Sequence, residues 1–201
     1  AVKGVVVNTV NLNAGKVMLW EVREKLRELK EAGKKVIVYI ENASLELYRF
    51  ASIADEIYME PMGNITFEGY MLGRSYLKGT LEKLGIGFDE WRFFKYKSAM
   101  EGFSLEKMSP ADREQRQALV DDWYADTKDD IMKARGLSSD QYENLINNVF
   151  LVSAEQALEL KLIDKSARWD SVKTALTKDG DFFVGNGQLK GNKEPKDNQW
   201  G

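Results

Sequence analysis

Histidine and cysteine are both absent from this sequence of 201 residues, which limits the chemistry open to the chain. Serine–histidine–aspartate and cysteine–histidine catalysis are excluded, as are metal sites built from thiolates or imidazoles. Near neutral pH, acid–base chemistry falls to lysine, aspartate, glutamate or tyrosine. One nucleophilic arrangement stays open, in which a lysine activates a serine.

Lys97 is the candidate base, because it follows the aromatic residues Phe93, Phe94 and Tyr96 at the end of a predicted strand. Burying a lysine costs free energy unless the ammonium is paired or loses its proton. Lys97 can therefore lay its stem along aromatic surface and keep its charge in water, or it can act as a general base. The residues alone favour the first interpretation, since most lysines are exposed.

The serine partner would have to lie at the start of a helix, where backbone N–H groups can stabilise an oxyanion. Ser44 is the one serine placed in this way directly after a predicted strand. Its simpler interpretation is a helix N-cap, which the residues alone favour. Ser98 is adjacent to Lys97, but neighbouring side chains on an extended segment point in opposite directions.

Other classes of site find no support in the sequence. A phosphate-binding loop is absent, and no glycine-rich dinucleotide motif follows the first predicted strand. The acidic pairs Asp121–Asp122 and Asp129–Asp130 lie on a predicted helix, where adjacent acids normally face solvent. The net charge of −3 does not suggest a nucleic-acid surface. We predict no metal and no cofactor.

The order of the predicted strands and helices, which must position these residues, indicates an α/β protein. Residues 2–10, 17–32 and 35–40 read as strand, helix and strand, and we expect the two strands to be parallel. Further strands are predicted at 56–59, 65–67 and 88–96. Further helices are predicted at 44–54, 75–84, 110–135, 138–147, 153–161 and 171–178. Short ββα-like units and a helical carboxyl-terminal third differ from the even alternation of a doubly wound fold.

Two details of this pattern bear on the site. Residues 41–43 are predicted to be a loop at the carboxyl end of the second strand, where α/β proteins tend to place their sites. The longest predicted helix, 110–135, has Ser109 as its N-cap, Pro110 at its first position and Gly136 at its end.

One domain is predicted over residues 1–180, with its first strand truncated, and residues 181–201 are predicted to be a linker or tail. The chain opens inside a predicted strand and without methionine, so we expect a fragment. No apolar run has the length that spans a bilayer, and no signal peptide is present. Either the chain is soluble or its targeting segment has been removed.

The residues around Lys97 resemble the lysine motif of the protease IV, or signal peptide peptidase A (SppA), family. The match consists of Tyr96-Lys97-Ser98-Ala99, then Glu101 and Phe103, then Met108-Ser109-Pro110. Segments 51–57 and 154–164 resemble two further family motifs, although Lys161 stands where the second has glycine. The similarity covers roughly residues 2–164.

This resemblance implies a crotonase/ClpP-like fold of ββα units, and a serine peptidase with a Ser/Lys dyad in which Lys97 is the general base. For that role the lysine must lose its proton, which burial or a nearby positive charge favours. The implied substrates are signal peptides or other peptides released from membranes. The implied setting is the extracytoplasmic (periplasmic) face of the inner membrane, reached through a segment outside this chain, in a ring- or dome-shaped oligomer.

The serine motif of the family is not intact in this chain. Active members carry Ala-Ser-Gly-Gly-Tyr, and aligning its tyrosine with Tyr48 places Leu45 at the serine and Glu46 and Leu47 at the glycines. Ser44 lies one residue too early, which is a turn of about 100° at a helix start. Long family members contain two homologous repeats, in which the amino-terminal repeat supplies the lysine and the carboxyl-terminal repeat the serine. This chain resembles the amino-terminal repeat, and its tail resembles the linker before the second.

Three hypotheses follow. In the first, the chain is the lysine-bearing half of a peptidase and is inactive alone. In the second, it is a catalytically silent repeat that serves assembly. In the third, it is a complete enzyme with Ser44 as nucleophile. A crotonase-type acyl-CoA enzyme is a weaker alternative, because the sequence shows no acid pair that could be placed at such a site.

Overall fold

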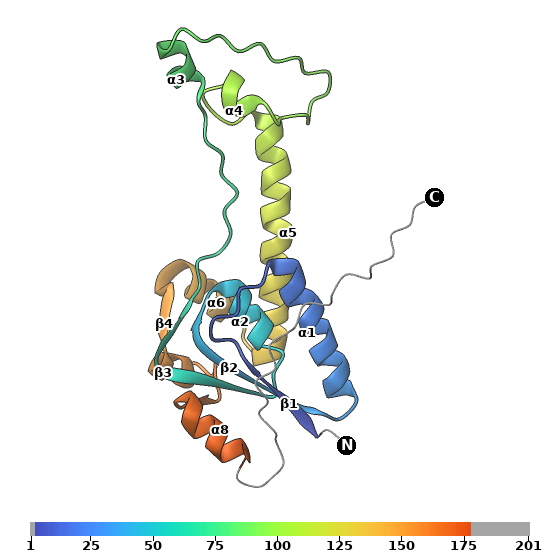
Figure 1. Ribbon diagram of the computed structural model, residues 1–201, viewed down its shortest axis with the longest axis vertical. Helices are drawn as coiled ribbons and strands as arrows, with labels where there is room; N and C mark the ends of the chain where they lie inside the picture. Colours follow the sequence, from blue (N-terminus) through green and yellow to red (C-terminus); the bar gives the residue numbers. More distant parts are fainter. Residues whose placement is uncertain (1–2, 178–201) are drawn as a thin grey trace, which may run out of the picture.

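The computed structural model describes residues 3–177, and the predicted linker or tail at 181–201 lies outside this range. The described residues form a mixed α/β fold in which helices cover a five-stranded sheet (Figure 1). The strands are β1 (Gly4–Asn8), β2 (Lys35–Ala43), β3 (Glu56–Thr66), β4 (Leu151–Ser153) and β5 (Lys165–Ser166). The helices are α1 (Lys16–Glu31), α2 (Leu45–Ala51), α3 (Lys78–Lys83), α4 (Glu101–Ser104), α5 (Pro110–Arg135), α6 (Ser139–Asn144), the π-helix η1 (Leu145–Val149), α7 (Ala154–Glu159) and α8 (Trp169–Thr177).

The first two strands and α1 form the predicted parallel βαβ unit. Val6 of β1 lies opposite Ile37 of β2, and β2 pairs in parallel with β3. Antiparallel β4 and parallel β5 also pair with β3, so the sheet has the order β1-β2-β3-β4 with β5 beside β3. The β-branched runs of these strands suit such burial, since parallel strands covered on both faces are continuously apolar. The predicted α/β class is confirmed.

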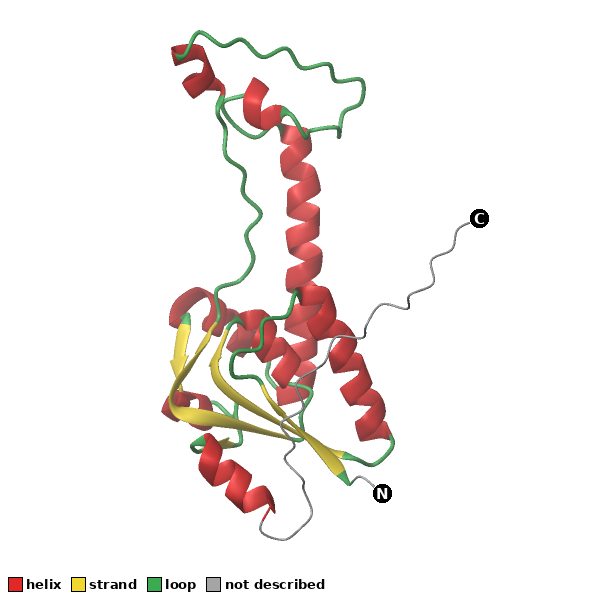
Figure 2. Cartoon of the chain, in the orientation of Figure 1, coloured by secondary structure: helices red, strands yellow, loops and turns green. Residues whose placement is uncertain are grey.

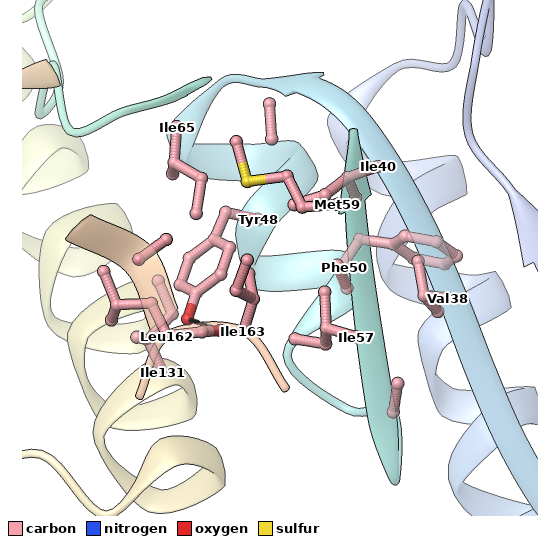
Figure 3. Packing of buried hydrophobic residues seen from close by; sticks show 14 of the residues in the cluster. Val38, Ile40, Tyr48, Phe50, Ile57, Met59, Ile65, Ile131, Leu162 and Ile163 are labelled. Atoms are coloured by element: carbon pink, nitrogen blue, oxygen red, sulfur yellow. Dashed lines mark hydrogen bonds between the residues drawn. The ribbon is translucent and has the colours of Figure 1, made fainter. Parts of the chain in front are cut away.

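The main core lies on the sheet face covered by α1, α2 and the end of α5. Figure 3 shows its buried apolar side chains, among them Val38, Ile40, Tyr48, Phe50, Ile57, Met59, Ile65, Ile131, Leu162 and Ile163. The Tyr48 hydroxyl donates to the Leu162 carbonyl at 2.7 Å, so its buried oxygen has a partner. A smaller cluster on the opposite face joins Tyr39 and Tyr58 to Val172 of α8. Leu45, Tyr48 and Phe50 of α2 all belong to the main core, so this packing fixes α2 against one face of the sheet.

The two strands predicted at 56–59 and 65–67 are one strand, β3, and the predicted loop at 41–43 belongs to β2. The first of these errors has a clear physical cause. Pro61 and Gly63 are typical of a break between strands, but here they mark an irregularity inside a continuous one.

Gly63 makes this irregularity possible because the two backbones approach very closely there. The register between β2 and β3 shifts between Ile40 and Asn42. A Cβ atom on Gly63 would lie only 2.0 Å from the carbonyl oxygen of Glu41. Any larger side chain at this position would therefore force the strands apart.

Helix α5 extends far beyond the sheet and carries a separate group of short elements. Its 26 residues correspond to about 39 Å of helix. Ser109 caps its start, and Gly136 ends it with a φ of 67°, as predicted. Figure 2 shows α3, α4 and their connecting loops gathered around the end of α5 that is remote from the sheet. We call residues 68–109 the arm.

The strand predicted at 88–96 is wrong, because this part of the arm is loop and turn. Within residues 3–177, none of the strands pairs with this segment. Its aromatic pattern resembles a strand, but an extended segment without a hydrogen-bonded neighbour is not stable as one. The helix predicted at 75–84 is the shorter α3, and α4 was not predicted. The helix predicted at 110–135 is present with these bounds, the helices predicted after it are present with shifted ends, and position 178 lies outside the described residues.

Candidate active site

Lys97 is exposed and lies in the arm, in the loop between α3 and α4. We call this loop, residues 84–100, the lysine loop. Its backbone N–H donates to the Phe94 carbonyl at 3.1 Å. Within residues 3–177 its ammonium has no hydrogen-bond or ion-pair partner. Its aromatic neighbours do not bury it, since Trp91, Phe93 and Phe94 are 85%, 80% and 71% exposed. The Lys97 ammonium is therefore unpaired, and the aromatic residues that precede it in the sequence are largely exposed.

Asp112, in the first turn of α5, binds the residue next to this lysine. Its carboxylate accepts a hydrogen bond from Ser98 Oγ at 2.7 Å and one from Arg116 Nε at 2.8 Å. Burial opposes ionisation of Asp112, but the hydrogen bonds and the nearby guanidinium charges outweigh it and lower the pKa of the carboxyl below its ordinary value. Asp112 is thus a charged, buried anchor for the lysine loop.

Glu101 is a second buried carboxylate near Lys97: it is the first residue of α4 and has no exposed surface. It accepts hydrogen bonds from Ser109 Oγ and from Arg92 Nη1, both at 2.6 Å. Burial again opposes ionisation, and the bonds from Ser109 and Arg92 again outweigh it, so the pKa of Glu101 lies below its ordinary value. Two residues of the lysine motif, Glu101 and Ser109, therefore bind each other, and Glu101 also binds Arg92.

Ser44 is the N-cap of α2, as its simpler interpretation predicted. Its exposed Oγ accepts a hydrogen bond from the Leu47 N–H at 3.3 Å. Within the described residues, no hydrogen bond joins Ser44 to a lysine. Leu45, which takes the place of the serine in the family motif, is the first residue of α2 and is 1% exposed in the core.

Glu46, in the place of the first motif glycine, is the centre of a polar cluster. It forms an ion pair with Lys16, with 3.2 Å between Nζ and Oε1, and accepts a hydrogen bond from the Tyr70 hydroxyl. The Tyr70 hydroxyl also binds Thr127 Oγ1 at 2.6 Å. The Lys16 ammonium lies 4.1 Å from the ring centroid of Trp123, a cation–π contact. Side chains from α1, α2, the arm and α5 thus meet where the motif has only glycine.

The structure does not bring Lys97 and Ser44 together. The lysine loop is bound to Asp112, at the start of α5, whereas α2 is bound to Thr127, through a hydrogen bond from Arg49. These two positions are 15 residues apart on one helix, which corresponds to about 22 Å. A lysine side chain cannot bridge that separation.

A cavity of about 340 Å³ lies between the end of α5, α6 and α7, with Arg135, Leu145 and Leu160 in its lining. It is at the opposite end of α5 from the lysine loop and has no part in this arrangement. Among residues 3–177, no group of three acidic or metal-binding side chains is placed to hold a metal ion. In the same range, no helix combines the length and apolar character needed to cross a membrane.

Residues 28–182 match the model of peptidase family S49. The chain belongs to this family. Protease 4 of Salmonella typhi is 30% identical to it over 185 residues, which are 88% of this chain and 30% of that protein. Protease 4 of Haemophilus influenzae is 32% identical over 139 residues, 69% of this chain and 21% of that protein. The chloroplastic serine protease SPPA of Arabidopsis thaliana is 28% identical over 178 residues, 89% of this chain and 26% of that protein. The chain therefore spans less than a third of each relative.

Membership of S49 confirms the resemblance to the protease IV/SppA family that the motif around Lys97 indicated. The mixed α/β architecture agrees with the crotonase/ClpP-like fold expected for S49. What the sequence did not reveal is which residues contact one another. In the sequence Glu46 is only a residue in the place of a glycine, and nothing in its spacing points to Lys16 or Tyr70. Asp112 is only one residue of the helix predicted at 110–135.

Proposed function

We propose that this chain supplies Lys97 as the general base of a Ser/Lys serine peptidase, and that the nucleophilic serine comes from a homologous unit outside this chain. The observation that carries the proposal is the contrast between two positions. Lys97 is exposed and unpaired at the remote end of α5, whereas the motif's serine position holds the buried Leu45. A base without a nucleophile in reach is what a divided site requires.

The proposed reaction uses an acyl-enzyme. Neutral Lys97 takes the proton of the incoming serine hydroxyl while its oxygen attacks the peptide carbonyl, and the lysine then gives that proton to the leaving amine. Water, deprotonated by the same amine, releases the acyl group in the second half of the cycle. No metal and no cofactor enters these steps.

The partner is proposed to be a second homologous repeat, within a ring- or dome-like homo-oligomer. The exposed aromatic residues that precede Lys97 support this, since several exposed aromatic side chains in one segment are typical of an interaction surface. Covering Trp91, Phe93 and Phe94 would also remove water from around Lys97. Desolvation favours the neutral amine, so assembly and activation of the base would occur together.

The proposed substrates are signal peptides or other peptides released from membranes. The protein would act at the extracytoplasmic face of the inner membrane, held there by a segment outside this chain. These assignments rest on the family resemblance of the lysine motif, and on relatives whose names identify them as Protease 4 and as a chloroplastic serine protease SPPA.

Replacing Lys97 in the active peptidase tests the proposal. We expect Lys97→Ala and Lys97→Arg each to lower kcat/KM by about 10²–10⁴-fold, because neither variant can accept the proton. Lys95→Ala is the matched control: Lys95 is exposed, two residues away, and paired with Glu114, and its variant should keep near-normal activity. Unchanged melting temperatures would show that the loss is chemical.

The second candidate is a catalytically silent repeat that serves assembly, and the exposed aromatic surface of the arm is equally compatible with it. Near-normal activity of Lys97→Ala would reject the base and leave this alternative.

A further inference from the structure

We infer that Ser98 and Asp112 are positioning residues for Lys97: they fix its backbone against the start of α5 and leave its side chain free. The inference rests on the proposed role of Lys97 as general base. The observation behind the inference is the set of hydrogen bonds that hold Ser98, the residue after Lys97.

Ser98 is fixed through both its side chain and its main chain. It is 8% exposed, and its Oγ donates to Asp112 Oδ1 at 2.7 Å. Its carbonyl oxygen accepts a hydrogen bond from the Glu101 N–H at 3.1 Å and another from the Arg74 guanidinium. A residue bound in this way restricts the φ and ψ angles available to its neighbour, Lys97.

Asp112 is itself held in place by several contacts, so its hydrogen bond to Ser98 fixes the position of Ser98 relative to α5. It is 2% exposed, and its backbone N–H donates to the Ser109 cap at 3.1 Å. Its carboxylate binds Arg116 at 2.8 Å and lies 3.9 Å from Arg74. The first turn of a helix also favours a carboxylate through the helix dipole. The anchor is therefore part of the most regular element in this region.

A second anchor holds the other side of the loop. Glu101 binds Ser109 and Arg92 and lies in α4, directly after the lysine loop. Ser109 thus links the two anchors, because it binds Glu101 through its hydroxyl hydrogen and the Asp112 N–H through its oxygen. The four polar residues Ser98, Glu101, Ser109 and Asp112 form one connected network.

This arrangement suits a base that must meet its partner from another unit. A catalytic group has to be held within a fraction of an ångström, and a misplacement of about 1 Å can cost about 10²-fold in rate. The network fixes the backbone at Lys97 without occupying its ammonium. A purely structural network predicts lost stability on substitution, whereas a positioning network predicts lost kcat.

The test compares Ser98→Ala with Ser98→Thr in the active peptidase. Ser98→Ala leaves Asp112 bound to Arg116, so the fold should persist, and we expect kcat to fall by about 10- to 100-fold with KM within about twofold. Ser98→Thr keeps the hydroxyl and should recover most of kcat. Asp122→Asn, an exposed carboxylate on the same helix, is the matched control and should leave kcat unchanged.

Hydrogen exchange in this chain alone gives a readout that does not depend on activity. Ser98→Ala should speed exchange of the Lys97 amide by about tenfold or more, because its bond to Phe94 would open more often. Unchanged kcat, a loss confined to KM, or unchanged exchange would each overturn the inference. Lys97→Ala, measured in the same series, separates the two proposals. If Lys97→Ala is inactive, the proposed function stands even when the inference about Ser98 is overturned. If Lys97→Ala is active, the proposed function itself is wrong.

Discussion

At the scale of single residues, the two positions of the proposed Ser/Lys dyad lie in different surroundings in this chain. The lysine keeps its motif and stands free, whereas the serine position holds a leucine that packs in the core. The neighbouring position holds Glu46, whose carboxylate is bound by Lys16 and Tyr70. The positions that the family motif gives to serine and glycine thus belong here to the core and to the contacts between α1, α2 and the arm.

Glu46 is therefore expected to stabilise the fold. Glu46→Gln removes the charge that pairs with Lys16, whose buried Nζ has no hydrogen-bond partner besides this ion pair. We expect the free energy of unfolding to fall by about 1–2 kcal/mol, measured by urea denaturation. Glu21→Gln, on the exposed side of α1, is the control. Equal stability of the two variants would show that the cluster contributes nothing.

At the scale of elements, the sequence predicts best where a local signal and the tertiary structure agree. The Ser109, Pro110 and Gly136 signals located both ends of α5, because caps act within one turn. The strand predicted at 88–96 is wrong for the opposite reason. A strand needs a hydrogen-bonded neighbouring strand, and the aromatic pattern cannot show whether one exists. The contact between Ser98 and Asp112 was equally hidden, since it depends on how the arm folds back onto α5.

Glu56 links three strands and gives the sheet a dependence on pH. Burial opposes its ionisation, but hydrogen bonds from Lys35, Lys165 and Tyr58 outweigh it and lower its pKa to about 2. A lowered folded-state pKa contributes stability above the unfolded-state value, and this stability is lost as the pH falls through the folded-state value. Glu56→Gln should therefore be less stable than the wild type at pH 7, by about 1–2 kcal/mol.

The difference should shrink steadily as the pH falls from about 4.5 toward 2, the interval between the ordinary and the lowered pKa. Unfolding free energies measured across this range check the sign. Glu31→Gln, an exposed glutamate at the end of α1, should show no such trend. A difference that grew in acid would contradict the role given to Glu56.

Gly63 tests the close approach of β2 and β3. Gly63→Ala would place a Cβ 2.0 Å from the Glu41 carbonyl oxygen, where backbone must move to make room. We expect a loss of about 3 kcal/mol in the free energy of unfolding. Gly73→Ala is the matched control, because nothing lies within 4 Å of its added Cβ, and it should change stability little. Equal effects would argue against the strand irregularity as described.

At the scale of the whole molecule, α5 separates a packed sheet domain from an arm with much of its apolar surface exposed (Figure 1). The α/β class, the βαβ unit and the family motif could be predicted from the sequence, since they depend on local patterns. The separation of about 22 Å along α5 between the lysine loop and α2 could not be predicted from the sequence, because it depends on where the arm packs against α5. This separation supports the proposal that the serine which meets Lys97 lies outside this chain.

Labelling with a serine-reactive fluorophosphonate, followed by peptide mapping, tests this division most directly. We expect no label on Ser44 or any other serine of this chain when it is alone. In the active peptidase we expect one labelled serine outside this sequence, and loss of that label in Lys97→Ala. Labelling of Ser44 in the chain alone would contradict the account and make this chain a complete enzyme.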